Sequence, residues 1–211
     1  MRRVPWWALA SSLAAPILLI GGWTVAAVAQ PVRFDAVART ISELAARDTP
    51  HRWVMTSALV GVGLSHVLTA LALHPAAAAG RLVYGIGGLA TLLVAAFPLP
   101  AGGGSSPAHT TAAGVSFVSL ALWPAFAWKR PRLPGQAFEN LFGPRVSAAA
   151  TGTLLLTLAW FFDELLVSGQ RVGLAERVAA GAQAVWPLVV VVSVRRAQGR
   201  VQRDVVDPRQ S

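Results

Sequence analysis

Six long apolar segments separated by short polar ones constrain this chain more than any other feature of its sequence. They cover residues 6–29, 53–73, 82–98, 109–128, 146–167 and 178–194. A helix needs about 20 apolar residues to cross roughly 30 Å of hydrocarbon, and each segment is close to that length. Only 13% of the 211 residues are charged and 55% are hydrophobic, whereas charged residues make up about 25% of an ordinary soluble domain. The pattern predicts an all-α integral membrane protein, a six-transmembrane-helix bundle forming a single membrane domain over residues 1–211.

The distribution of Lys and Arg predicts the orientation of this bundle. With the N-terminus inside, twelve of the 18 Lys and Arg residues fall in inner segments and six fall in outer ones. Cytoplasmic loops are enriched in these residues. We therefore expect a plasma-membrane protein with both termini in the cytoplasm, including a basic tail over residues 195–211. The net charge of +9 follows this topology rather than one face, so the lipid bilayer and not nucleic acid is the predicted partner.

The N-terminal segment allows a second interpretation. Two arginines, an apolar run and the small residues Ala27-Val-Ala-Gln30 resemble a cleavable signal peptide. The apolar run is longer than the usual signal core of about 7 to 15 residues, and Pro31 follows close behind the possible cleavage site. A retained first helix is therefore the favoured prediction.

The polar insert between the first two apolar segments is the most regular charged stretch of the chain. Asp35, Arg39, Glu43 and Arg47 recur every fourth residue with alternating sign, and the apolar residues between them follow helical spacing. Opposite charges four residues apart stabilise a helix. Residues 40–43 also fit a capping box, which would begin the helix at residue 41 instead. We predict a short amphipathic helix from residue 35 or 41 to residue 46, with its apolar face on the bundle.

Several short motifs occur at the ends of the apolar segments. Thr40-Ile-Ser-Glu-Leu-Ala45 lies just outside the first segment, and Pro50-His-Arg-Trp53 opens the second. Ala96-Phe-Pro98 closes the third and His109 opens the fourth. In these motifs and their order the chain resembles, over nearly its whole length, the domain-of-unknown-function 998 family. The resemblance implies a six-helix integral membrane protein and brings no established activity with it. Many relatives carry an acidic residue soon after Phe-Pro, and its absence here argues against a metal or acid-base site in that loop.

Ionisable groups in or beside the apolar segments are the candidates for a functional site. Such a group is costly in a bilayer unless it meets a partner or a wet cavity. The predicted outer polar cluster consists of Asp35, Arg39, Ser42, Glu43, His109, Asp163 and Glu164. The alternative is local pairing, with Asp163 bound to Arg39 or Arg171. His66 is predicted to lie inside the membrane, either bonded to a hydroxyl or carbonyl of another helix or acting as a ligand or proton relay.

No motif in the sequence names a substrate or a reaction, and no catalytic residue is assigned. Metal-ligand spacings such as His-x-x-x-His are absent, so neither a metal nor a cofactor is predicted. The favoured interpretation is a membrane protein, non-catalytic or of unknown activity, that binds a lipid headgroup or small molecule in an outer polar vestibule covered by the insert. One alternative is a membrane-embedded hydrolase that uses His109 with Asp163 or Glu43. The other is a small oligomeric transporter with His66 on its path.

Overall fold

The apolar segments form six long helices in the computed structural model, which describes residues 3–104, 106–129 and 142–206. All six are long and apolar enough to cross a membrane. No strand occurs in the described ranges, and the predicted all-α, six-helix membrane fold is confirmed. The helices are α1 (Trp6–Val28), α3 (Trp53–Ala72), α4 (Ala78–Ala96), α5 (Pro107–Ala127), α6 (Pro144–Leu166) and α7 (Val172–Val206), with the short helix α2 (Ile41–Leu44) between α1 and α3.

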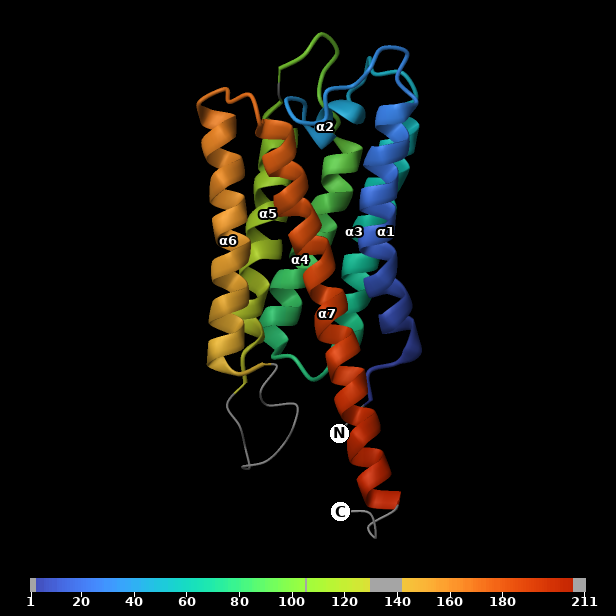
Figure 1. The fold of residues 1–211 in the computed structure, drawn as a ribbon, viewed down its shortest axis with the longest axis vertical. Coiled ribbons are helices and arrows are strands. Elements are labelled where there is room, and N and C mark those ends of the chain that lie inside the picture. The colour runs from blue at the N-terminus through green and yellow to red at the C-terminus, as the bar shows by residue number, and fades with distance from the viewer. Residues whose placement is uncertain (1–2, 105, 130–141, 207–211) are drawn as a thin grey trace.

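Helices that follow one another in the sequence also pack side by side. α1 packs on α3, α3 on α4, α4 on α5, α5 on α6 and α6 on α7, and α7 returns to α1 to close the ring. Figure 1 shows α2 at one end of the bundle, with the start of α1 and the end of α7 at the other. We call these the α2 end and the terminal end.

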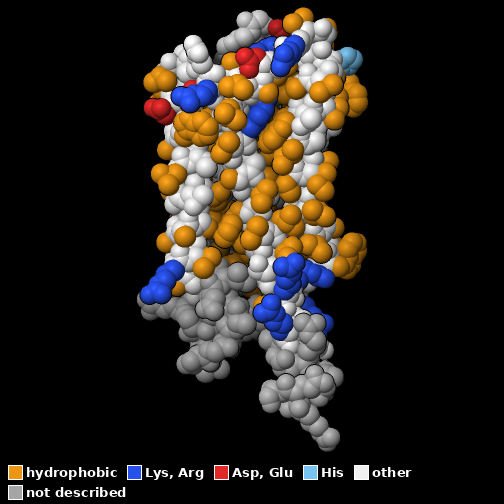
Figure 2. Space-filling model, viewed as in Figure 1, with side chains coloured by type: hydrophobic (Ala, Val, Ile, Leu, Met, Phe, Trp, Pro, Cys, Tyr) orange, Lys and Arg blue, Asp and Glu red, His pale blue; other side chains and the backbone are white. Residues whose placement is uncertain are grey.

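Large apolar side chains cover the outside of the bundle. Ile17, Leu64 and Leu156 are 60%, 50% and 73% exposed, as suits side chains that face lipid. In Figure 2 hydrophobic side chains fill the middle of the visible face, and charged side chains gather toward its two ends. An apolar band between two charged ends matches the layers of a bilayer. The protein is therefore a multi-pass membrane protein.

α3 and α4 approach each other closely where two glycines face one another. A Cβ on Gly63 would lie 2.8 Å from the carbonyl oxygen of Gly88, and a Cβ on Gly88 would lie 2.9 Å from that of Gly63. Neither position has room for a larger residue. Small residues at such contacts let membrane helices gain van der Waals packing that lipid alone would not supply.

Two helices extend beyond the predicted apolar segments. α4 begins at residue 78 rather than 82 and so includes Arg81, which donates to two carbonyl oxygens at the end of α3, each at 2.9 Å. α7 begins at residue 172 rather than 178 and continues to residue 206. Residues 195–206, the first part of the predicted basic tail, thus continue this helix, and residues 207–211 lie outside the described residues. With 35 residues, α7 is about 52 Å long, and it projects past the bundle in Figure 1.

Candidate binding site at the α2 end

The connection from α1 to α2 contains a turn held by Asp35. Its Oδ1 accepts hydrogen bonds from the backbone N–H groups of Val37 at 2.9 Å and Ala38 at 3.1 Å. These bonds, that of Ala38 most, hold the pKa of the exposed Asp35 carboxyl below its usual range. Aspartate favours such turns because its side chain bonds the backbone two residues on. The first of the two predicted helix starts, at residue 35, is therefore wrong, and the carboxylate of Asp35 forms no ion pair with Arg39, whose side chain pairs with Glu43.

α2 begins at Ile41, the second of the two predicted starts. The hydroxyl of Thr40 accepts from the N–H of Glu43 at 3.3 Å, and the carboxylate of Glu43 accepts from the N–H of Thr40 at 2.9 Å. This reciprocal pair is a capping box, which satisfies N–H groups that a first helical turn leaves free. Arg39 adds an ion pair to Glu43 at 2.8 Å. Ile41 and Leu44 are 4% and 0% exposed, so the apolar face of α2 lies on the bundle as predicted.

Glu176, in the first turns of α7, lies beneath α2 and is hydrogen-bonded to it. Its carboxylate accepts hydrogen bonds from the N–H of Ile41 and, at 3.4 Å, from the hydroxyl of Ser42. The N–H at the start of a helix has no intrahelical acceptor, and Glu176 provides one. The side chain is 4% exposed, and it forms no ion pair with any residue in the described part of the chain.

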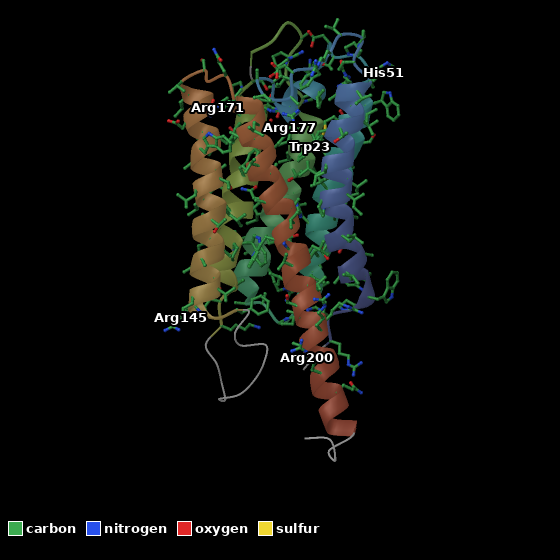
Figure 3. All side chains as sticks on the ribbon, in the orientation of Figure 1. Trp23, His51, Arg145, Arg171, Arg177 and Arg200 are labelled. Carbon is green, nitrogen blue, oxygen red and sulfur yellow. The ribbon has the colours of Figure 1, made fainter. Side chains whose placement is uncertain are left out.

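Arg177 binds the backbone of the insert. Its Nη1 donates to the carbonyl oxygens of Ala36 and Arg39, each at 2.8 Å. The guanidinium also lies 5.8 Å from the ring centroid of Phe34 and 5.9 Å from that of Trp23, within range of a cation–π interaction. Figure 3 shows Arg177 and Trp23 near the α2 end of α7 and α1. Arg177 therefore ties the insert, α1 and α7 together.

The first turn of α7 also contacts the insert backbone directly. Leu174 donates from its N–H to the carbonyl oxygen of Val37 at 3.0 Å. At Gly173 a Cβ would lie 2.1 Å from the carbonyl oxygen of Arg39 and 2.8 Å from that of Ala36. Only glycine leaves room for this approach. The insert is thus fixed on α7 by close backbone packing as well as by Glu176 and Arg177.

The remaining members of the predicted outer cluster are not joined to α2. The ring Nδ1 of His109 is 2.8 Å from the carbonyl oxygen of Phe97, so the imidazole caps the end of α4. Glu164 accepts from the N–H of Arg171 at 3.0 Å and lies 3.6 Å from its Nε. Asp163 is exposed, and its carboxylate has no hydrogen bond or ion pair within residues 3–104, 106–129 and 142–206.

The structure therefore assembles only part of the predicted cluster. Arg39 pairs with Glu43, and the neighbouring Ser42 bonds Glu176. No hydrogen bond or ion pair among the described residues joins His109, Asp163 or Glu164 to α2. Local pairing of the α6 end with Arg171 does occur, but through Glu164 rather than the predicted Asp163. No group of three or more His, Asp and Glu side chains placed to hold a metal ion occurs in the part of the chain that the structure describes.

A narrow cavity of about 60 Å³ lies beneath α2 inside the bundle. Its walls come from α2 and from every long helix except α6. A polar cavity of this size has room for a few water molecules. The polar side chains that line it are Ser42, His66, Thr91, Ser116, Glu176 and Gln183.

Two buried side chains at this cavity keep one polar atom without a partner. His66, 1% exposed, bonds through Nδ1 to the hydroxyl of Tyr84 at 2.9 Å. Gln183, 1% exposed, donates from Nε2 to the carbonyl oxygen of Phe117 at 3.1 Å. Neither His66 Nε2 nor Gln183 Oε1 has a hydrogen-bond partner among the described residues. As polar atoms of side chains that line the cavity, they are suited to bind water or a ligand there.

Sequence reasoning identified His66 and Ser42 but missed Glu176 and Gln183. Hydropathy predicts that the last apolar segment begins at residue 178, which excludes Glu176 from it. A usable signal was present, since Glu176 and Gln183 are seven residues apart and so share one face of a helix. If the last predicted helix began two turns earlier, Glu176 and Gln183 would both lie on the face of that helix that packs on the bundle.

Comparison with known proteins identifies a family. The model of a family described as "Protein of unknown function (DUF998)" matches residues 12–193, a range that includes parts or all of α1 to α7. No curated protein and no solved structure matches the chain.

Proposed function

The chain belongs to the DUF998 family of membrane proteins, and we propose that it binds a small, positively charged group in the cavity beneath α2. The observation that carries this proposal is Glu176, a carboxylate that lines the cavity, is 4% exposed and has no ion pair with the described residues. A buried charge is costly unless an opposite charge or hydrogen bonds compensate it. The adjacent guanidinium of Arg177 donates to backbone carbonyls instead. A cationic ligand would add the direct ion pair that Arg177, which acts on Glu176 only through its nearby charge, does not form.

The size and lining of the cavity favour an amine over a larger group. A volume of about 60 Å³ is far below the roughly 300 Å³ of the smallest pockets for drug-sized ligands. An ammonium group needs acceptors, and Glu176, the hydroxyl of Ser42 and the free Oε1 of Gln183 offer them. The source of the amine is either the headgroup of a lipid or a free small molecule.

α2 covers this site, since its residues Ile41 and Ser42 line the cavity. Glu176 uses its carboxylate to accept from the N–H of Ile41 and the hydroxyl of Ser42. A cation bound to the same oxygens competes with these bonds. Ligand binding is thereby coupled to the position of α2, and a small movement of the insert admits or releases the ligand.

We also propose that the α2 end faces the outside of the plasma membrane and that both termini are cytoplasmic. This orientation is supported by the excess of Lys and Arg in the segments at the terminal end. It places the amine site near the outer surface, where extracellular solutes and outer-leaflet lipids have access.

The proposed function is tested by replacing Glu176 with Gln in the full-length, detergent-solubilised protein. Ethanolamine should raise the thermal unfolding temperature of the wild type, since a ligand at 100 times its Kd stabilises a protein by about 2.7 kcal/mol. Ethylene glycol, which has a hydroxyl in place of the amine, should not. The shift should disappear in Glu176→Gln and persist in Glu164→Gln, a matched control because Glu164 is also buried at the α2 end but pairs with Arg171. An equal shift in both variants would refute Glu176 as the anionic partner, and stabilisation in phosphatidylethanolamine nanodiscs but not by ethanolamine would make lipid the source.

Transport is a second candidate function. It is favoured by the extent of the cavity, which reaches from Glu176 near the α2 end to His66 deep in α3. The free Nε2 of His66 gives a second polar contact further into the membrane. Uptake of labelled ethanolamine into proteoliposomes, lost in Glu176→Gln, is the expected result for transport. Binding without uptake would reject it.

A further inference from the structure

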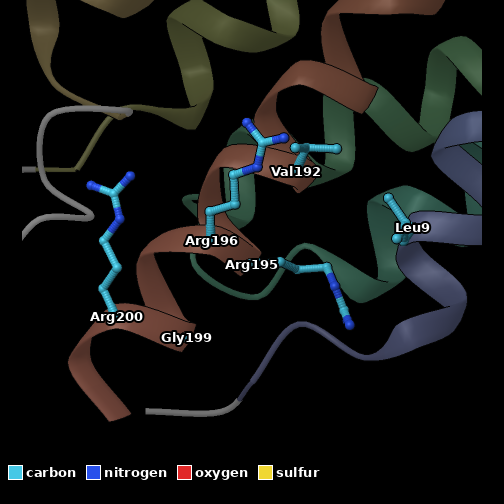
Figure 4. Close-up of a pocket in the computed structure, with 6 residues that line it drawn as sticks. All are labelled: Leu9, Val192, Arg195, Arg196, Gly199 and Arg200. Carbon is cyan, nitrogen blue, oxygen red and sulfur yellow. The ribbon is translucent and has the colours of Figure 1, made fainter. Parts of the chain in front are cut away.

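A basic groove crosses α7 at the terminal end, far from the α2 site. It has a volume of about 610 Å³ and is open to the outside of the bundle. Figure 4 shows its lining, which consists of Leu9 from α1 and Val192, Arg195, Arg196, Gly199 and Arg200 from α7.

The three arginines of the groove differ in their partners. Arg195 donates from Nη1 to the carbonyl oxygen of Val4 at 2.8 Å, and so holds the chain before α1 against α7. The side chains of Arg196 and Arg200 form no hydrogen bond or ion pair with any residue in the described part of the chain. They are four residues apart, which places them on one face of the helix. In Figure 4 both side chains extend to the same side of α7, away from Arg195.

No acidic side chain in the described part of the chain balances these charges. The acidic residues whose side chains are described all lie in the α1–α3 connection, at the end of α6 or at the start of α7, which is the α2 end. Two like charges four residues apart repel each other. An anion between Arg196 and Arg200 would remove this repulsion and satisfy their free N–H donors.

We propose that this groove binds the phosphate headgroup of an anionic phospholipid. The position favours a lipid over a free anion, because the groove lies where the apolar stretch of α7 gives way to Arg195, Arg196 and Arg200, as a membrane-spanning helix does at the headgroup layer. Leu9 and Val192 give the groove an apolar side toward the bilayer. Arginine suits such a boundary, since its stem packs on apolar surface while its guanidinium reaches the headgroup layer. The planar guanidinium can also donate two parallel hydrogen bonds to the oxygens of one phosphate.

The test measures binding of phosphatidylglycerol to the full-length protein by native mass spectrometry, with phosphatidylcholine as the uncharged comparison. An arginine that contacts the anionic headgroup contributes enough to weaken binding about fivefold when it is removed. Arg196→Gln and Arg200→Gln should each show this loss, and the double variant should show a loss of about 25-fold. Arg145→Gln is the control, since Arg145 is exposed at the same end on α6 but outside the groove, as Figure 3 shows. It should change binding by less than about twofold.

A second variant tests the groove without removing an arginine. A Cβ on Gly199 would meet no atom within 4 Å, so Gly199→Glu adds a negative charge to the groove without disturbing packing. It should weaken phosphatidylglycerol binding at least as much as Arg200→Gln. Equal losses for Arg145→Gln and Arg200→Gln, equal binding of phosphatidylcholine, or full competition by inorganic phosphate at millimolar concentration would each overturn the proposal.

Discussion

Replacing Gly173 with Ala should loosen the contact between α7 and the insert. The added Cβ would lie 2.1 Å from the carbonyl oxygen of Arg39, against the 3.4 Å at which ordinary contact begins. One element must therefore move by 3.4 − 2.1 = 1.3 Å, and the neighbour is backbone rather than a flexible side chain end. Overpacking of this kind costs about 1–3 kcal/mol. The gain in helix propensity from Gly to Ala offsets up to about 1 kcal/mol.

We expect a net destabilisation of about 1–2 kcal/mol for Gly173→Ala, or a fall in unfolding temperature of roughly 2–8 °C. The matched control is Gly152→Ala on α6, where an added Cβ meets no atom within 4 Å. That change should be neutral or stabilising, because it raises helix propensity and creates no steric clash.

The position of α2 can be read in the same variants with a single cysteine. The chain contains no Cys, so Ala45→Cys, at a residue that is 4% exposed, gives one reporter next to α2. Its reaction with a maleimide should be faster in Gly173→Ala than in Gly152→Ala. Stabilisation by both alanines with unchanged labelling would show that α7 and the insert do not approach as closely as the structure indicates.

Two further predictions concern the insert and the orientation of the bundle. Glu43→Ala should destabilise the protein by about 1–2 kcal/mol in thermal unfolding, because it removes the capping box and the Arg39 ion pair. Asp48→Ala loses one exposed bond to the N–H of Gly102 at 2.7 Å and should cost about 0.5 kcal/mol; a larger loss for Asp48 would contradict the role given to Glu43. A reporter fused after the C-terminus should be cytoplasmic and one inserted at residue 103 external, and an external C-terminal reporter would reverse the proposed orientation.

The six helices could be predicted from the sequence because their cause is local. In hydrocarbon a chain must satisfy its backbone groups within itself, so an apolar run of about 20 residues is confined to helix. The start of α2 is local in the same sense. Thr40 and Glu43 are three residues apart and bond each other's backbone wherever the insert lies.

The ends of the helices are less predictable, because an apolar segment ends at the first charged residues whereas a helix can continue past them. Arg81 and Glu176 both lie inside helices. Each is accommodated by bonds to the backbone of another element, at the end of α3 and the start of α2 respectively. A hydropathy scale scores each residue without regard to such partners. It therefore places charged residues such as these outside the predicted apolar segments.

The site itself was decided by tertiary structure. Glu176 and Ile41 are 135 positions apart in the chain, and they meet only because α7 packs on α1 and closes the ring. Which carboxylate reaches α2 depends on the rotation of each helix about its axis, and packing across the whole bundle sets that rotation. The sequence alone thus determined the helices and the capping box of the insert. Tertiary packing placed Glu176, rather than His109 or Asp163, beneath α2, because partners that bond across helices are chosen by the packing and not by the spacing of residues along the chain.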